Sequence, residues 1–272
     1  GRGGATAVLR AVGGRKGILV PRMVCHHTPT VRCIVSCTSI PQRLAHIHST
    51  VTTLAAQDGI AGAFLFLPTF CVKYDNAPYF PLPQSLLAVP GLNIVKCGKD
   101  EGPWTKLLPA LRQEQDPSTR IIVADDDHFY PMNWALSLLR ASLQHPDAMI
   151  GYGGWYNPLT KTQVFYGSLG YIVRRGMFEQ DLSTFCDTLS SHCRMGDDLS
   201  SSYYVQNVRG FAAYKIDGKS PGVPGEARRD TVFEPNHAMR RQRLIPGNLM
   251  NYAVCTVQLQ QSRMRAAVEA AL

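Results

Sequence analysis

Short apolar runs and helical periodicities alternate along the first half of the chain. Buried strands are predicted where β-branched and apolar residues dominate, over 31–40, 62–70, 92–97, 119–124 and 148–152. Helices are predicted between them by apolar positions at helical spacing, over 43–57, 103–115 and 131–144. Alternating strands and helices are typical of an α/β fold in which helices flank a mostly parallel central sheet.

The pattern changes after residue 153 to shorter segments rich in glycine and aromatic residues. It predicts strand-forming residues over 164–173, a helix near 174–189 and another helix opened by Gly196-Asp197-Asp198. The stretch 217–247 is polar and rich in proline, which predicts a mobile flap before a terminal helix at 256–272. Ligands of parallel sheets bind at the carboxyl ends of the strands, so we expect the chemistry at that rim.

Composition and charge narrow the class of protein. The chain has 272 residues, of which 45% are hydrophobic and 18% charged, as expected for one globular domain rather than a disordered chain. Its net charge of +8 favours an anionic partner, with phosphate in any form among the candidates. No stretch approaches about 18 uninterrupted apolar residues, so we expect no transmembrane segment.

The N-terminal segment and the cysteines leave alternatives open. The first acidic residue is Asp58, so the chain before it carries only basic charges. We interpret residues 1–30 as a disordered basic extension and expect a cytoplasmic protein, with a removed anchor or transit segment as the alternative. The 8 cysteines include no Cys-x-x-Cys pair, which argues against a zinc ribbon. Cys186 and Cys193 either bridge a loop or stay reduced.

Three consecutive carboxylates, Asp125, Asp126 and Asp127, directly follow the apolar run 121–124. Carboxylates so close together repel one another unless a cation neutralises them, so a divalent metal is their natural counterpart. Oxygen ligands in an open site suit Mn²⁺ or Mg²⁺, which also bind a diphosphate. The alternative is a solvated acidic turn that caps the next helix.

Residues 102–131 carry a second signal around this triplet. They read Gly-Pro-Trp-Thr-Lys-Leu-Leu-Pro-Ala-Leu and, after a short gap, Asp-Pro-Ser-Thr-Arg-Ile-Ile-Val-Ala-Asp-Asp-Asp-His-Phe-Tyr-Pro. With 36–43 and 196–198, they resemble the donor-site region of family 2-like glycosyltransferases of the GT-A fold, over about residues 31–215. The resemblance implies a GT-A (Rossmann-like) catalytic domain at 31–255, with a nucleotide-sugar half at 31–130 and an acceptor half at 131–255.

The resemblance also implies roles for individual residues on the donor side. Thr38 and Arg43 would lie by the nucleotide base and phosphates, and Asp125 by the ribose, with Asp126 beside them. Asp127 would ligate the metal, and Asp125 and His237 are the further candidate ligands. Lys106 would reach the donor phosphates or hold the acidic motif in place, unless it is a surface lysine. Asp75, next to Tyr74, has the location of a base-binding acid.

On the acceptor side, the resemblance implies that Asp198, with Asp197 as second candidate, is the general base of an inverting enzyme. A retaining enzyme would need no such base, and the helix dipole alone favours acids at a helix N-terminus. Trp155 and Tyr156 follow glycines, and aromatic faces beside glycines suit stacking on a sugar ring. Packing in the core explains these two aromatic residues equally well.

The leading interpretation is a metal-dependent glycosyltransferase of the hexosyltransferase type. It would transfer a sugar from a nucleotide-diphosphate-sugar donor, a UDP-sugar first, to a glycan or other hydroxyl acceptor with inversion. One alternative is a nucleotidyltransferase of related fold, which would be expected to carry a glycine-rich basic loop where this chain has Thr38-Ser39-Ile40-Pro41. Another is an inactive carbohydrate-binding module. Nucleic acid is not expected as a partner, because clustered carboxylates repel phosphates.

Overall fold

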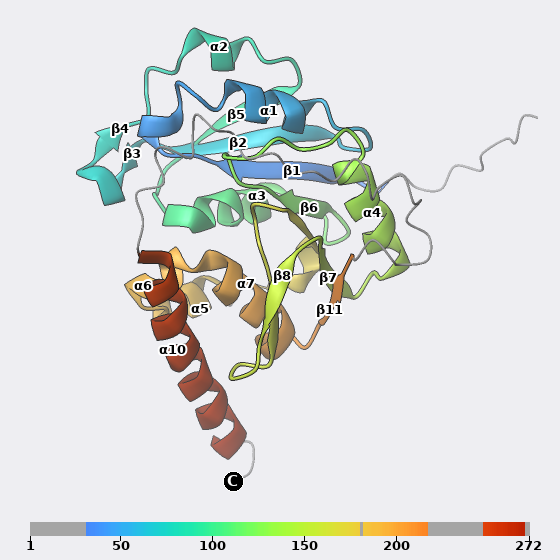
Figure 1. Ribbon diagram of the computed structural model, residues 1–272, viewed down its shortest axis with the longest axis vertical. Helices are drawn as coiled ribbons and strands as arrows, with labels where there is room; N and C mark the ends of the chain where they lie inside the picture. Colours follow the sequence, from blue (N-terminus) through green and yellow to red (C-terminus); the bar gives the residue numbers. More distant parts are fainter. Residues whose placement is uncertain (1–30, 180–181, 217–246, 270–272) are drawn as a thin grey trace, which may run out of the picture. The chain divides into compact units, whose positions relative to one another are not determined.

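The computed structural model describes residues 31–179, 182–216 and 247–269, and Figure 1 shows how their elements are arranged. Seven strands form the central sheet, in the order β11-β7-β10-β6-β1-β2-β5. In chain order they are β1 (Cys33–Thr38), β2 (Gly62–Pro68), β5 (Leu92–Cys97), β6 (Arg120–Val123), β7 (Ala148–Gly151), β10 (Tyr171–Arg174) and β11 (Ala212–Lys215). Two small ribbons pair β3 (Phe70–Cys71) with β4 (Ala77–Pro78) and β8 (Gly154–Asn157) with β9 (Thr162–Phe165).

Six of these seven strands run in one direction. β1 pairs in parallel with β2 and β6, β2 with β5, and β11 with β7. β10 lies antiparallel between β6 and β7. The predicted GT-A-like α/β class, with a mostly parallel central sheet flanked by helices, is confirmed by this topology.

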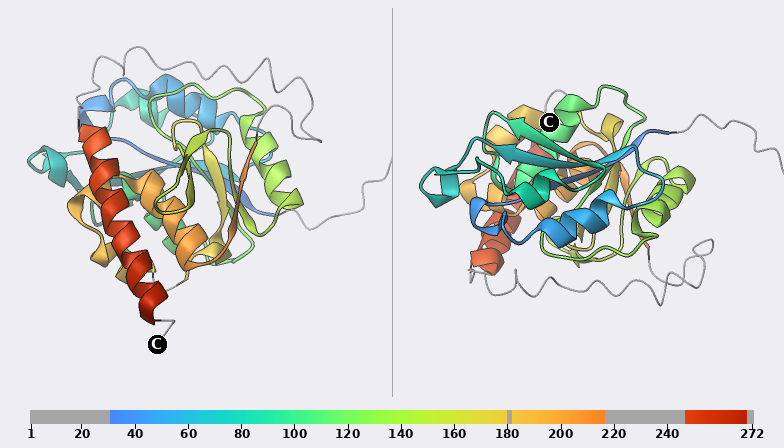
Figure 2. Two further views of the ribbon diagram at one scale, coloured as in Figure 1. Left: turned by 60° about the horizontal axis from the view of Figure 1, so that its bottom comes forward. Right: turned by 90° about the horizontal axis from the view of Figure 1, so that it is seen from above.

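Side chains of the central strands alternate between two hydrophobic cores, one on each face of the sheet. Val35 and Ile122 enter the core beneath α1 (His48–Ala55) and α4 (Trp134–Gln144). Ile34 and Ile121 enter the opposite core. Helices on that second face are α3 (Leu108–Gln113), α5 (Leu182–Thr188), α6 (Ser191–Met195), α7 (Asp197–Tyr203) and α10 (Gly247–Glu269), as the views of Figure 2 show. Because both faces are covered, the strands read as apolar runs.

The helices differ more from the predictions than the strands do. The helix predicted over 43–57 is divided into η1 (Pro41–Arg43) and α1, and the helix predicted over 103–115 into η3 (Gly102–Lys106) and α3. Pro109 explains the second division, because a residue without an amide hydrogen fits the first turn of a new helix. Shorter helical segments are η2 (Val72–Tyr74), α2 (Gln84–Leu87), η4 (Arg175–Met177) and the π-helical η5 (Tyr204–Val208).

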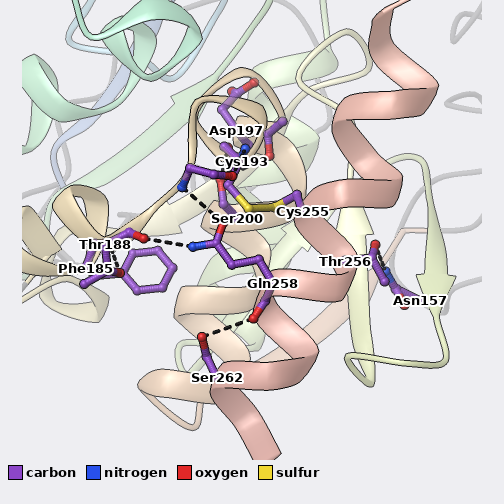
Figure 3. Close-up of a disulfide and its surroundings, with 12 residues drawn as sticks. Asn157, Phe185, Thr188, Cys193, Asp197, Ser200, Cys255, Thr256, Gln258 and Ser262 are labelled. Atoms are coloured by element: carbon purple, nitrogen blue, oxygen red, sulfur yellow. Dashed lines mark hydrogen bonds between the residues drawn. A yellow bond between two sulfur atoms is a disulfide. The ribbon is translucent and has the colours of Figure 1, made fainter.

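The terminal helix α10 begins at Gly247 rather than at residue 256, so its first turns belong to the domain. Its Cys255 forms a disulfide with Cys193 of α6, as Figure 3 shows. The bridge between Cys186 and Cys193 considered from the sequence is therefore wrong, and the Cys186 thiol is free and buried. Spacing could not identify the pair, because its two cysteines are 62 residues apart.

Three sequence predictions fall outside the described residues. They concern the basic extension 1–30, the flap expected over 217–247 except for its last residue, and the candidate metal ligand His237. None of the helices that the structure describes combines the length and the apolar composition that a bilayer crossing requires.

Candidate active site

The acidic triplet and the end of β1 meet in one cavity at the carboxyl rim of the sheet. β1 and β6 are parallel neighbours, so Thr38 and the residues after Val123 emerge side by side. The cavity has a volume of about 490 Å³. Its walls contain most of the predicted site residues, namely Thr38, Arg43, Lys106, Asp125, Asp126, Asp127, Asp197 and Asp198.

Arg43 holds the acidic motif. Its guanidinium lies 2.6 Å from Asp126 Oδ1 and 4.0 Å from Asp127 Oδ2. The Ser39 hydroxyl also donates to Asp126, which is buried. Burial raises the pKa of Asp126 to about 6, although Arg43 and Ser39 oppose the rise. Asp126 therefore anchors the turn, and Asp125 and Asp127 on either side keep more exposed carboxylates.

Lys106 connects the acidic triplet to the second acid pair. Its Nζ lies 2.7 Å from Asp125 Oδ1, 2.9 Å from Asp197 Oδ2 and 3.7 Å from Asp198 Oδ1. The side chain is only 6% exposed, so the alternative of a surface lysine is wrong. Burial alone would lower its pKa, but these three carboxylates hold the pKa of Lys106 well above its ordinary value.

The backbone of η3 fixes where Lys106 can reach. Trp104, two residues before the lysine, and Leu107, directly after it, are buried in the core of the second sheet face. The Ser36 hydroxyl of β1 donates to the Lys106 carbonyl oxygen. The backbone at Lys106 is thus fixed against β1, and its ammonium group lies among the carboxylates.

Asp197 and Asp198 occupy the first turn of α7, where the helix dipole favours negative charge. Both are buried, and Asp198 Oδ1 accepts the Gly167 amide hydrogen at 3.1 Å. Burial raises the pKa of both carboxyls, against the influence of Lys106. A group of this kind holds a proton more tightly than an ordinary aspartate does.

Gly167 is a site residue that the sequence did not identify as one. Its amide donates to Asp198, and its carbonyl oxygen accepts from the Asp125 amide at 3.2 Å. A Cβ atom at this position would lie 2.7 Å from both Asp125 Oδ1 and Lys106 Nζ. The absence of a side chain at Gly167 therefore allows Asp125, Asp198 and Lys106 to come together.

The remaining predicted residues either bond elsewhere or lie outside the cavity lining. Thr38 lines the cavity, but its hydroxyl donates to the Phe66 carbonyl oxygen at 2.8 Å. Asp75 is exposed and does not line the cavity, whereas its neighbour Tyr74 does. Trp155 and Tyr156 of β8 are also outside the lining, and Tyr156 is 56% exposed.

Several lining residues could not be predicted from local patterns. Tyr79 lines the cavity and donates to the Ser39 carbonyl oxygen at 3.0 Å. Tyr252 comes from α10 and lines the cavity. Its ring makes an edge-on contact with the Trp155 ring, so that tryptophan lies next to the lining. Isolated tyrosines carry no sequence signal, because only the fold determines what they face.

The charges around the cavity fit a divalent cation. Six aspartates and three basic side chains line it among the described residues, an excess of three carboxylates. Asp125 and Asp127 keep 30% and 14% of their side chains exposed, and both offer the hard oxygen ligands that Mn²⁺ and Mg²⁺ prefer. The structure's described part contains no group of three His, Cys, Asp or Glu side chains able to hold a metal unaided.

A comparison with protein-family models and with curated protein sequences finds no match. Among solved structures, the chain is similar to the mannosyltransferase PcManGT from Pyrobaculum calidifontis, in complex with GDP-Man and Mn²⁺. The two share 13% identity over 88% of this chain and 75% of that one, with a TM-score of 0.48.

Two further structures are similar over a large part of the chain. One is the 4-diphosphocytidyl-2C-methyl-D-erythritol synthase from Anaerococcus prevotii, with 9% identity over 74% of this chain and 97% of that one and a TM-score of 0.45. The other is S. aureus TarS 1–349, with 11% identity over 70% and 59% and a TM-score of 0.43. Likenesses this distant do not show family membership.

Proposed function

We propose that the protein is a metal-dependent glycosyltransferase that moves a sugar from a nucleotide-diphosphate-sugar to an acceptor hydroxyl with inversion. A single observation carries this proposal. Lys106 joins the acidic triplet at the sheet rim to the acid pair of α7 within one cavity, at 2.7 Å from Asp125 and 2.9 Å from Asp197. A donor site that binds a metal and an acceptor site that removes a proton must lie this close for direct transfer.

Asp127 and Asp125 would hold Mn²⁺ or Mg²⁺ on the donor side, with His237 as a further candidate. The cation supplies positive charge to the departing diphosphate when it is bound. Arg43 keeps Asp126 and Asp127 in place, and Thr38, which lines the cavity, is the proposed contact to the nucleotide. A UDP-sugar is the first donor to test, and Asp75 with Tyr74 is the proposed contact to its base.

Asp198 would act as the general base on the acceptor side. Its carboxylate accepts the proton of the attacking hydroxyl while the bond between the sugar and the diphosphate breaks. Asp197 is the second candidate, but its carboxylate already pairs with Lys106 at 2.9 Å. Asp198 lies farther from the lysine, at 3.7 Å, and is therefore the more available acceptor of a proton. Trp155 and Tyr156 remain our candidates for contacts to the sugar or the acceptor.

Donor binding tests this proposal without requiring the acceptor. We expect one class among UDP-, GDP-, dTDP- and CMP-sugars to raise the melting temperature with Mn²⁺ present and not with EDTA. A ligand at one hundred times its Kd adds about 2.7 kcal/mol to the free energy of unfolding, which is a shift of several degrees. Asp127→Asn should abolish the shift, while Asp58→Asn, at an exposed carboxylate outside the cavity, should preserve it. A shift that is equal in EDTA, or unchanged in Asp127→Asn, would refute the donor site.

A further inference from the structure

Tyr252 reaches the proposed base from the far end of the chain. It lines the cavity, and its hydroxyl lies 3.5 Å from Asp198 Oδ2. The other carboxylate oxygen, Oδ1, accepts the Gly167 amide hydrogen at 3.1 Å. The separation of 3.5 Å is long for a hydrogen bond, as contacts to catalytic groups often are before a substrate binds. The two carboxylate oxygens of Asp198 thus face donors from two different segments, the loop at Gly167 and helix α10.

A covalent tether holds this tyrosine in place. Cys255, three residues after Tyr252, is bonded to Cys193, which lies four residues before Asp197 (Figure 3). Both cysteines are fully buried. The disulfide therefore links the turn that carries Tyr252 to the segment that leads into the acid pair, and its burial suits a permanent tether better than an exposed redox switch.

Hydrogen bonds on two sides of α10 support the tether. Asn157 Nδ2 of β8 donates to the Thr256 hydroxyl at 2.9 Å. Gln258 donates to the Thr188 carbonyl oxygen at 2.8 Å, and its own oxygen accepts the Ser190 amide hydrogen at 3.1 Å. Figure 3 shows these contacts on either side of the disulfide. The part of α10 just after Tyr252 is therefore fixed against both α5–α6 and β8.

On these grounds, and resting on the proposed function, we propose that Tyr252 is a positioning residue for the Asp198 carboxylate and that the Cys193–Cys255 disulfide keeps it there. Tyr252 would orient the base toward the acceptor hydroxyl without touching the donor. The ionised base is stabilised by a hydroxyl donor, and the phenol can serve as one because it stays protonated.

Among the described groups around Asp198, Tyr252 is favoured for this role because its hydroxyl lies within hydrogen-bond distance of the carboxylate. The charged and titratable groups that face it are Lys106, Asp125, Asp197, Tyr166, Tyr171 and Tyr252. Lys106 is shared among three carboxylates, and Tyr171 is fully buried with its hydroxyl 3.4 Å from that of Ser201. Burial raises the pKa of Tyr252 far above its ordinary range, so its proton remains available for donation.

Tyr252→Phe tests the role while it keeps the ring and its packing against Trp155. We expect kcat to fall about fivefold to tenfold, as loss of one hydrogen bond to a charged group implies, with the donor KM unchanged. The half-point of the rising limb of the pH profile should move to higher pH, because the ionised base loses a donor. Val257→Ala, an exposed position on the same helix, is the control and should change neither.

Cys255→Ala tests the tether. We expect amide hydrogen exchange in 247–269 to accelerate, nitration of Tyr252 to increase, and kcat to fall at least as far as in Tyr252→Phe. Adding Tyr252→Phe to Cys255→Ala should then cause little further loss, since both changes remove one contact. Cys186→Ser, which removes a free buried thiol, is the matched cysteine control.

The outcomes separate the two proposals. If the wild type transfers no sugar from any donor, the proposed function fails and the positioning role of Tyr252 fails with it. If the wild type transfers sugar and Tyr252→Phe keeps the wild-type kcat and pH profile, the inference alone is wrong. Should Cys255→Ala not fold, the Tyr252→Phe comparison still decides.

Discussion

Lys106 is the residue on which the site's electrostatics depend. It is buried among Asp125, Asp197 and Asp198, and carboxylates packed so closely would otherwise repel one another. A single ammonium group in contact with three carboxylates leaves a negative excess. That excess is the physical reason for expecting a divalent cation on the donor side and a proton-accepting carboxylate on the acceptor side.

Asp198→Asn should separate activity from stability. Burial raises the folded-state pKa of Asp198 above its unfolded value of 3.8, so its ionised form destabilises the fold at neutral pH. The isosteric amide removes that charge and can still accept the Gly167 amide hydrogen. We expect the rate of transfer to fall 10²-fold to 10⁴-fold while the melting temperature at pH 7.5 rises.

The pH dependence of stability provides a second test of whether the ionised Asp198 carboxylate destabilises the fold. As pH falls from neutral toward 4, the folded wild type takes up the proton, and its deficit relative to Asp198→Asn should close. Denaturation of both proteins across this range measures the difference. A variant that is less stable than the wild type at pH 7.5, or a difference that widens with acid, would contradict the assignment.

Much of the residue-scale site was predictable, because its members sit in short motifs. Asp125 to Asp127 directly follow a strand, which puts them at the rim of the sheet, and Asp197 and Asp198 open a helix, which made them candidates for the base. Tyr252 and Gly167 were not predictable. Their contacts depend on how segments far apart in the chain fold together, and neither residue type is unusual where it stands.

At the scale of elements, strands were more predictable than helices. β5 has the predicted bounds, Leu92–Cys97, because a glycine marks each end of the run, Gly91 before it and Gly98 after it. The helix predicted over 43–57 failed at its start, where Pro41 opens a separate short turn and α1 begins only at His48. Helix ends depend on local capping and tertiary contacts, which periodicity does not report.

The loop between β9 and β10 should be sensitive to one added methyl group. Gly167 has no positive φ, so alanine is allowed by the backbone and any effect comes from contact with Asp125 and Lys106 at 2.7 Å. We expect Gly167→Ala to lower kcat by more than about tenfold, since it displaces both groups. Steady-state kinetics would measure this loss, and Gly98→Ala, where a Cβ meets nothing within 4 Å, is the control. Equal kcat values in the two variants would show that transfer does not require the side-chain-free position at Gly167.

At the scale of the whole molecule, charge is distributed unevenly. The chain carries a net charge of +8, yet the cavity has an excess of three carboxylates among its described lining residues. A basic protein with an acidic cavity can attract an anionic donor at long range and still require a cation to hold it. Metal dependence is therefore the part of the proposed function that this charge distribution predicts.

Release of nucleoside diphosphate from the donor that binds best is the most direct test of the whole account. The measurement compares Mn²⁺ with EDTA, and the wild type with Asp127→Asn and Asp198→Asn. We predict metal-dependent release by the wild type, loss of donor binding in Asp127→Asn, and retained binding with slow release in Asp198→Asn. Release that persists in EDTA, or an Asp198→Asn variant as fast as the wild type, would contradict a metal-dependent transfer with Asp198 as its base.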